Sequence, residues 1–112
     1  PTIFGDGMQT RDFTYISNAV EANLCAMTCG ESAFGGSYNV ACGQRYSLLD
    51  LVSTLNQILE TKVEPVLAEP RAGDVKHSMA DISAAEGKLG YRPGIAFFEG
   101  LGRTAAWFRK KL

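Results

Sequence analysis

The sequence predicts a mixed α/β (α+β) fold, in which a small sheet of few strands packs on helices. Two segments, 47–59 and 98–111, carry apolar side chains at the spacing of an amphipathic helix. Short β-prone segments alternate with the helical ones, and Gly or Pro residues separate them. A chain of 112 residues buries a modest core, so we expect residues 1–112 to form one small domain.

The N-terminal part is expected to hold two strands and a helix. Thr2–Phe4 is short and β-prone, and Asp12–Ile16 is β-prone again. Asn18 precedes Glu21 by three residues, which predicts a capping box at the start of a helix. The apolar spacing carries this helix to about Thr28.

The middle of the chain predicts strand, helix and strand. Ser37–Val40 has the pattern of a short buried strand. Ser47 is expected to cap the second helix, with Asp50 three residues on. Val63–Leu67 is β-prone, but Pro65 donates no hydrogen bond and so restricts it to a sheet edge. The second helix has an apolar stripe formed by Leu48, Leu51, Val52, Leu55, Ile58 and Leu59.

The C-terminal part predicts a loop and two further helices. Glu69–Val75 is polar and contains Pro and Gly, as expected of a loop. Asp81 is expected to cap a third helix that runs to about Leu89 and ends at Gly90. A last helix is expected over Phe98–Lys111.

Composition excludes several classes of protein. The net charge is −1 and both signs are spread along the chain, so no nucleic-acid surface is expected. No apolar run approaches the roughly 18 to 20 residues that span a bilayer, and no secretory leader is visible. Three cysteines without a C-x-x-C pattern favour free thiols in a reducing cytoplasm over a disulfide framework or a metal site.

The 112 residues carry no recognisable catalytic motif. They contain neither a G-x-x-G-x-x-G nor a G-x-G-x-x-G fingerprint for a dinucleotide. None of the four tyrosines has a lysine four residues later. His77 is the single histidine, and a histidine without an evident partner is more often structural than catalytic. We therefore expect no catalytic residue in this chain.

Three charged residues form a candidate anion site. Arg11 follows the turn sequence Gly5–Gly7, and Arg71 and Asp74 lie in the polar loop. Two arginines from separate loops make a suitable clamp for a diphosphate, because guanidinium matches phosphate oxygens bidentately. A carboxylate beside them can accept both hydroxyls of a ribose. The alternative is an exposed pair between Arg71 and Asp74, which spacing alone favours.

Four blocks of sequence, in order and covering nearly the whole chain, resemble one known family. They are IFGDGMQTRDFTYI with the helix NAVEANLCAM, then SYNVACGQRYSLLDLV, then EPRAGDVKHSMADISAAEGKLGYRP, and finally EGLGRTAAWF. These blocks resemble the C-terminal part of extended short-chain dehydrogenase/reductase proteins of the NAD-dependent epimerase/dehydratase family. Within it they are most similar to UDP-glucose and UDP-N-acetylglucosamine 4-epimerases.

The resemblance implies a division of labour between two domains. Members of the family have an N-terminal Rossmann domain that holds NAD and a smaller C-terminal domain that grips the nucleotide sugar. This chain would be most of the smaller domain, would bind no NAD itself, and would be inactive alone. It would meet a Rossmann-type partner domain, or associate with itself through the face left uncovered.

The resemblance also assigns residue roles at the phosphate end. Arg11 and Arg71 resemble the two arginines that bind the diphosphate, and Asp74 resembles the carboxylate that holds the ribose hydroxyls. Gln9 matches a position that helps to hold the nucleotide. The strand ending at Phe4 matches a segment whose backbone meets the uracil.

The resemblance says less about which sugar is bound than about which residues bind the nucleotide. Ser78 matches the position that gates sugar size, and a small serine favours N-acetylated sugars. Other readings stay open: a nucleotide-sugar dehydratase, a free-standing nucleotide-sugar-binding or oligomerising module without catalysis, or a truncated product that binds nothing.

Overall fold

The computed structural model describes residues 1–111. Its strands are short: β1 (Thr2–Phe4), β2 (Thr10–Arg11), β3 (Tyr46–Ser47) and β4 (Val66–Ala68). Its helices are α1 (Ile16–Thr28), the 3₁₀ turn η1 (Glu31–Ala33), α2 (Leu48–Leu59), α3 (Ser83–Leu89) and α4 (Phe97–Lys111). The predicted mixed α/β class is confirmed.

The strands form two small sheets. Strand β1 pairs in parallel with β4, with Ile3 opposite Leu67. Strand β2 pairs antiparallel with β3, with Arg11 opposite Tyr46. A single bridge also joins Thr10 to His77. Segments that are far apart in the sequence, residues 46–47, residues 66–68 and His77, therefore meet around β1 and β2.

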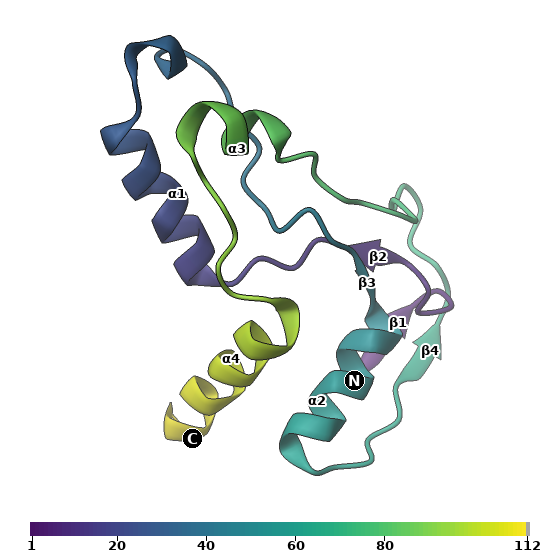
Figure 1. Ribbon diagram of the computed structural model, residues 1–112. Coiled ribbons are helices and arrows are strands. Elements are labelled where there is room, and N and C mark those ends of the chain that lie inside the picture. Colours follow the sequence, from purple (N-terminus) through teal and green to yellow (C-terminus); the bar gives the residue numbers. More distant parts are fainter. Residues whose placement is uncertain (112) are drawn as a thin grey trace.

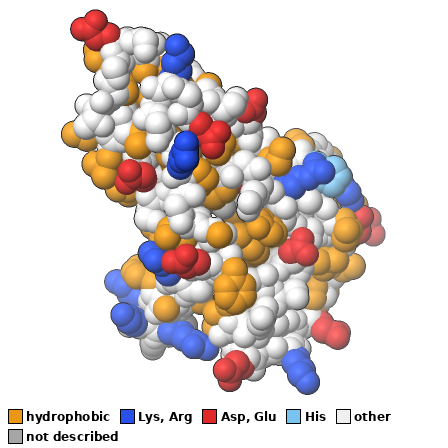
Figure 2. Space-filling model, in the orientation of Figure 1, with side chains coloured by type: hydrophobic (Ala, Val, Ile, Leu, Met, Phe, Trp, Pro, Cys, Tyr) orange, Lys and Arg blue, Asp and Glu red, His pale blue; other side chains and the backbone are white. Residues whose placement is uncertain are grey.

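The chain forms a flat body with two lobes (Figure 1). The α1/α3 lobe contains α1, η1 and α3, and the cleft lobe contains the strands, α2 and α4. The radius of gyration is 16.5 Å, whereas a compact domain of this length has about 13 Å. The exposed surface is 7735 Å², against about 6000 Å² for a compact monomer of this size. Figure 2 shows hydrophobic side chains gathered where the lobes meet and along the α1 edge.

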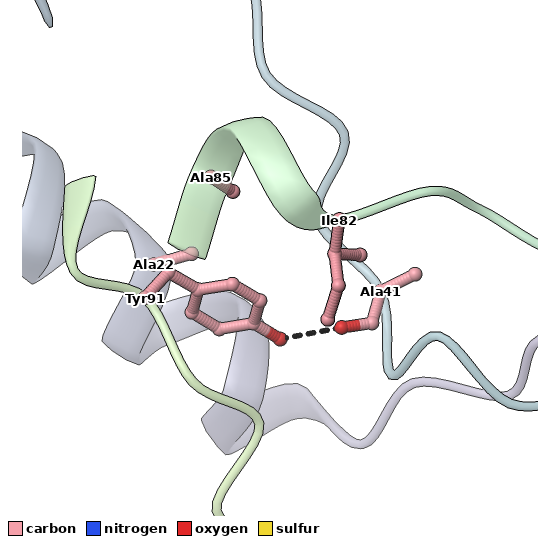
Figure 3. Packing of buried hydrophobic residues seen from close by; sticks show 5 residues of the cluster. All are labelled: Ala22, Ala41, Ile82, Ala85 and Tyr91. Carbon is pink, nitrogen blue, oxygen red and sulfur yellow. Dashed lines mark hydrogen bonds between the residues drawn. The ribbon is translucent and has the colours of Figure 1, made fainter. Parts of the chain in front are cut away.

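The α1/α3 lobe is built around Tyr91, which is fully buried. Its ring packs with Ala22 of α1, Ala85 of α3 and Ile82 (Figure 3). Its hydroxyl donates to the carbonyl oxygen of Ala41 at 2.8 Å, so the buried polar group is satisfied. Small alanines let the two helices approach a single large side chain.

The second helix begins as predicted. Ser47 is the N-cap of α2: its hydroxyl accepts from the Asp50 N–H, and the Asp50 carboxylate accepts from the Ser47 N–H. This reciprocal pair satisfies N–H groups at the helix start. The helix ends with Glu60 in the left-handed conformation at φ 55°. Helix α2 contacts α4, and Leu51 of its apolar stripe lines a pocket together with Leu101 and Thr104 of α4.

The first helix begins differently from the prediction. Residues 12–15 are irregular, so the strand predicted over Asp12–Ile16 is wrong, and the sequence passes directly into α1. The predicted capping box at Asn18 is also wrong. The N-cap is Tyr15, which makes no side-chain cap, and Asn18 lies inside the helix. Asn18 bonds both the N–H and the C=O of Ile95 instead, at 3.0 and 2.8 Å.

The strand predicted over Ser37–Val40 is wrong as well. This segment has no strand partner among the described residues, and all of it except Tyr38 is exposed. A β-strand needs a neighbour to satisfy its backbone, so an isolated apolar segment stays irregular. The structure places its third strand at Tyr46–Ser47 instead.

The C-terminal elements follow the prediction closely. Residues 69–75 form a loop. The strand predicted over Val63–Leu67 is present but shorter and shifted, because β4 covers Val66–Ala68 and begins just after Pro65. The Asp81 carboxylate accepts from the Ser83 N–H at the start of α3, as a cap does, although the helical N-cap is Ile82. Helix α3 ends at Gly90, whose φ of 69° is accessible to glycine at little cost. None of the helices within residues 1–111 is both long and apolar enough to cross a bilayer.

Candidate functional site

A cleft of about 490 Å³ opens between the end of β1 and the loop that follows β4. Its walls come from two segments that are far apart in the sequence, residues 4–9 and 68–76. The parallel pairing of β1 with β4 brings these segments together, because the two strands end at the same edge. The Gly5 N–H extends the pairing by donating to the Ala68 carbonyl at 2.9 Å.

The turn after β1 depends on its glycines. Gly5 and Gly7 have φ of 101° and 77°, a conformation that other residues rarely adopt. A Cβ on Gly7 would lie 2.7 Å from the Leu49 side chain of α2. The turn is therefore packed against α2, which fixes one wall of the cleft.

Phe4 and Arg71 face each other across the cleft. Phe4 is 37% exposed, and the Arg71 guanidinium carbon lies 3.9 Å from the centre of its ring. This is the geometry of a cation–π contact. Phe4 thus offers an aromatic face, and Arg71 offers five donors at the same place.

Gln9 is the buried polar residue of the cleft wall, with 6% of its surface exposed. Its side-chain amide donates to the Phe4 carbonyl at 2.7 Å. Its Oε1 atom is buried and has no hydrogen-bond partner within residues 1–111. Gln9 therefore fixes the end of β1 and keeps an unused acceptor.

Arg11 reaches the cleft through Asp74. Its Nη2 lies 2.7 Å from Asp74 Oδ1, and its Nη1 donates to the Thr10 carbonyl at 2.8 Å. The side chains of Arg11 and Asp74 are 31% and 41% exposed. The sequence offered an Arg71–Asp74 pair as the alternative to a clamp. The pair that forms uses Arg11, while the Asp74 N–H closes a turn onto the Arg71 carbonyl.

Ser78, unlike Arg11, is not joined to the cleft by a contact with one of its lining side chains. It is exposed and does not line the cleft walls. Its N–H donates to the Thr10 carbonyl at 3.1 Å, so it belongs to the bridge beside β2. The neighbouring His77 ring contacts the Thr10 hydroxyl at 3.0 Å, which is a local structural role.

Sequence reasoning missed a second ion pair in the cleft. Lys76 Nζ contacts both carboxylate oxygens of Asp6, at 2.8 and 2.6 Å. The Lys76 ammonium and the Met8 N–H hold the pKa of the Asp6 carboxyl below its usual value. The two residues are 70 positions apart, so no local spacing relates them.

Sequence reasoning also missed the role of Asp12. Its carboxylate accepts from the N–H groups of Cys42, Gly43 and Ala80, at 2.9, 2.9 and 3.4 Å. Two distant segments, residues 42–43 and Ala80, are joined to this one side chain. Asp12 therefore stabilises the connection between the lobes.

The chain matches known proteins over nearly its whole length. The sequence model of the NAD dependent epimerase/dehydratase family matches residues 1–41. UDP-glucose 4-epimerase of Mycolicibacterium smegmatis is 36% identical over 97% of this chain. The structure of UDP-glucose 4-epimerase with UDP-glucose from Thermotoga maritima superposes with a TM-score of 0.90 at 38% identity, over 98% of this chain.

A further structure extends the comparison to a cofactor complex. UDP-glucuronic acid 4-epimerase from Bacillus cereus, in complex with UDP-glucuronic acid and NAD, superposes with a TM-score of 0.92 at 32% identity, over 99% of this chain. The chain spans about a third of the length of these proteins: 34% of the Mycolicibacterium epimerase and 35% of each of the two solved structures. In sequence and in structure, then, the chain belongs to the NAD dependent epimerase/dehydratase family and corresponds to about a third of a full-length member.

Proposed function

We propose that this chain binds the UDP part of a nucleotide sugar on behalf of an NAD-dependent 4-epimerase. The observation that carries the proposal is the cleft itself, in which Phe4, Gln9, Arg71 and Asp74 meet and to which Asp74 joins Arg11. The complexes of related epimerases with UDP-glucose and UDP-glucuronic acid support it.

The charges of the cleft fit a nucleoside diphosphate. Arg11 and Arg71 supply always-charged planar donors for the diphosphate, and the Phe4 ring supplies an apolar face beside the base. In the free chain, Arg71 covers Phe4 and Asp74 pairs with Arg11. The ligand would replace both contacts, with phosphate on the arginines and the ribose hydroxyls on Asp74.

Titration calorimetry of the 112-residue chain with UDP tests the proposal. Charge-assisted hydrogen bonds contribute about 1.5 to 3 kcal/mol, so Arg11→Ala and Arg71→Ala should each weaken binding about tenfold to a hundredfold. Arg92→Ala is the matched control, because Arg92 is exposed and lies outside the cleft. Absence of saturable UDP binding by the folded wild-type chain would refute the proposal.

The proposal also includes a preference for the sugar. A small Ser78 is expected to admit N-acetylated sugars, so UDP-N-acetylglucosamine should bind about as well as UDP-glucose. Ser78→Tyr should lower only the affinity for the N-acetylated sugar. An equal loss for both sugars would remove Ser78 from the sugar site.

The residues of this chain do not fit NAD. The glycine turn 5–7 follows a strand but leads into strand β2. A dinucleotide site needs a glycine loop that opens a helix, whose N-terminus then receives the pyrophosphate. The proposal therefore leaves NAD and the chemistry to a Rossmann domain, and expects no epimerase activity from the 112 residues alone. Turnover of UDP-galactose by the purified chain would contradict this.

The outer face of α1 is proposed to contact that Rossmann domain. Ile16, Val20, Leu24 and Met27 recur at helical spacing and are each at least half exposed. The surplus of exposed surface, about 1700 Å² over a compact monomer, exceeds the roughly 800 Å² that each partner buries in a standard interface. Without that domain the face should drive self-association. A strictly monomeric chain in sedimentation at high concentration would count against it.

A cytoplasmic location, supported by the free thiols of Cys25, Cys29 and Cys42, completes the proposal.

A further inference from the structure

The cleft loop, residues 69–76, is held in place mainly by side chains. The backbone of residues 69–75 makes one turn hydrogen bond, from the Asp74 N–H to the Arg71 carbonyl at 3.3 Å. The next backbone anchor is the Lys76 carbonyl, which accepts from the Thr10 N–H at 2.8 Å. Between these points, side-chain contacts reach across to residues 4–11.

Three such contacts join the loop to the opposite wall. Arg71 lies over Phe4, Asp74 pairs with Arg11, and Lys76 pairs with Asp6. Under the proposed function, the nucleotide takes over the first two, because their side chains are its binding groups. The third contact requires nothing from the ligand and can remain while the other two exchange partners.

The Asp6 carboxylate is well placed to hold the loop. Its Oδ1 accepts from the Met8 N–H at 2.9 Å, within a turn whose Gly7 is packed against Leu49 of α2. Both of its oxygens contact Lys76 Nζ, at 2.8 and 2.6 Å. The ion pair thus connects the rigid wall of the cleft to the end of the loop that carries Arg71 and Asp74.

We propose that the Asp6–Lys76 ion pair tethers the cleft loop to the Gly5–Gly7 turn and thereby positions Arg71 and Asp74 for the nucleotide. Asp6 and Lys76 are then positioning residues and make no contact with the ligand. This inference rests on the proposed function. Its physical basis is preorganisation: a loop that is already held pays less conformational entropy when the ligand binds.

A double-mutant cycle with UDP as the probe tests the tether. Asp6→Asn and Lys76→Met should each weaken binding by about two- to tenfold, and the double variant should lose no more than either single one. The charge reversal Asp6→Lys with Lys76→Asp should recover most of the affinity. A loss from Lys76→Met that persists in the Asp6→Asn background would overturn the tether, because Lys76 would then contact the ligand itself.

The control pair is Glu99–Arg103 on α4, which has the same 2.6 Å separation and similar exposure but lies outside the cleft. Glu99→Gln should leave UDP affinity unchanged. If the wild-type chain binds no UDP, the proposed function fails, and the tether is judged on the free chain. Backbone ¹⁵N order parameters of residues 70–75 should fall in Asp6→Asn and Lys76→Met but not in Glu99→Gln. Unchanged order parameters in both cleft variants would overturn the tether independently of any ligand.

Discussion

The two lobes hold their positions by different means. In the α1/α3 lobe, buried side chains meet around Tyr91, and its buried hydroxyl is satisfied by a fixed bond to the Ala41 carbonyl. In the cleft lobe, partly exposed charged side chains join segments that are far apart in the sequence, as Arg11 does with Asp74. Burial excludes ligands, whereas exposed pairs can exchange one partner for another at low cost.

This contrast separates stability from binding. Substitutions around Tyr91 should lower the free energy of unfolding and leave the affinity of the folded chain for UDP unchanged. Substitutions of the cleft charges should lower the affinity for UDP and leave the free energy of unfolding unchanged. Three experiments test the separation, in order of decreasing effect.

Removal of the Tyr91 side chain should have the largest effect. Loss of a buried aromatic side chain costs about 3 to 5 kcal/mol, so Tyr91→Ala should unfold the lobe or leave it barely stable. Tyr91→Phe keeps the ring and leaves the Ala41 carbonyl without its donor, which costs about 1 to 3 kcal/mol. Urea unfolding followed by circular dichroism measures both. A Tyr91→Phe variant that stays folded but loses UDP affinity would break the contrast.

Asn18→Ala should have an intermediate effect. Asn18 is 2% exposed and bonds both backbone groups of Ile95, so its loss should cost about 1 to 3 kcal/mol. Asn23→Ala is the control on the same helix: Asn23 is exposed, and alanine has the better helix propensity. Equal unfolding free energies for the two variants would show that the bond to Ile95 contributes nothing.

The α2 capping box should show the smallest effect, and one that depends on pH. Ser47→Ala should cost about 1 kcal/mol at neutral pH. Hydrogen bonds from the Ser47 hydroxyl and N–H hold the pKa of Asp50 below its usual 3.8. The stability they provide is therefore fully present above pH 3.8 and is lost as the pH falls through the lowered pKa. The difference between wild type and Ser47→Ala should shrink in acid, and a constant difference down to pH 2 would assign it to something other than Asp50.

The elements predicted correctly are those with local causes. Ser47 and Asp50 lie three residues apart and cap each other, so the sequence contains the whole interaction. Asn18 had the same kind of local pattern, but it bonds Ile95, which lies 77 residues away. The spacing of neighbouring residues does not reveal that a partner far away in the sequence will bond the same side chain. Similarly, Ser37–Val40 has the composition of a strand, but no neighbouring strand lies among the described residues.

The candidate site divides in the same way. Residue type and loop position were enough to select Arg11, Arg71 and Asp74, and Phe4, Gln9, Arg71 and Asp74 do line one cleft. The pairing of Asp74 with Arg11 spans 63 residues and depends on the parallel pairing of β1 with β4. The ion pair between Asp6 and Lys76 could not be predicted either, because these residues are 70 positions apart in the sequence. The binding roles of these residues stay predictions until the titrations are made.

The flat shape of the body has a calorimetric consequence. Its smallest extent is 19 Å, whereas one helix with its side chains is about 10 to 12 Å across. A plate of this thickness buries little apolar surface, and apolar surface is what raises the heat capacity when a protein unfolds. The isolated chain should therefore show a heat-capacity increment below the usual 12 to 15 cal/mol/K per residue, roughly speaking, and its stability should vary only shallowly with temperature.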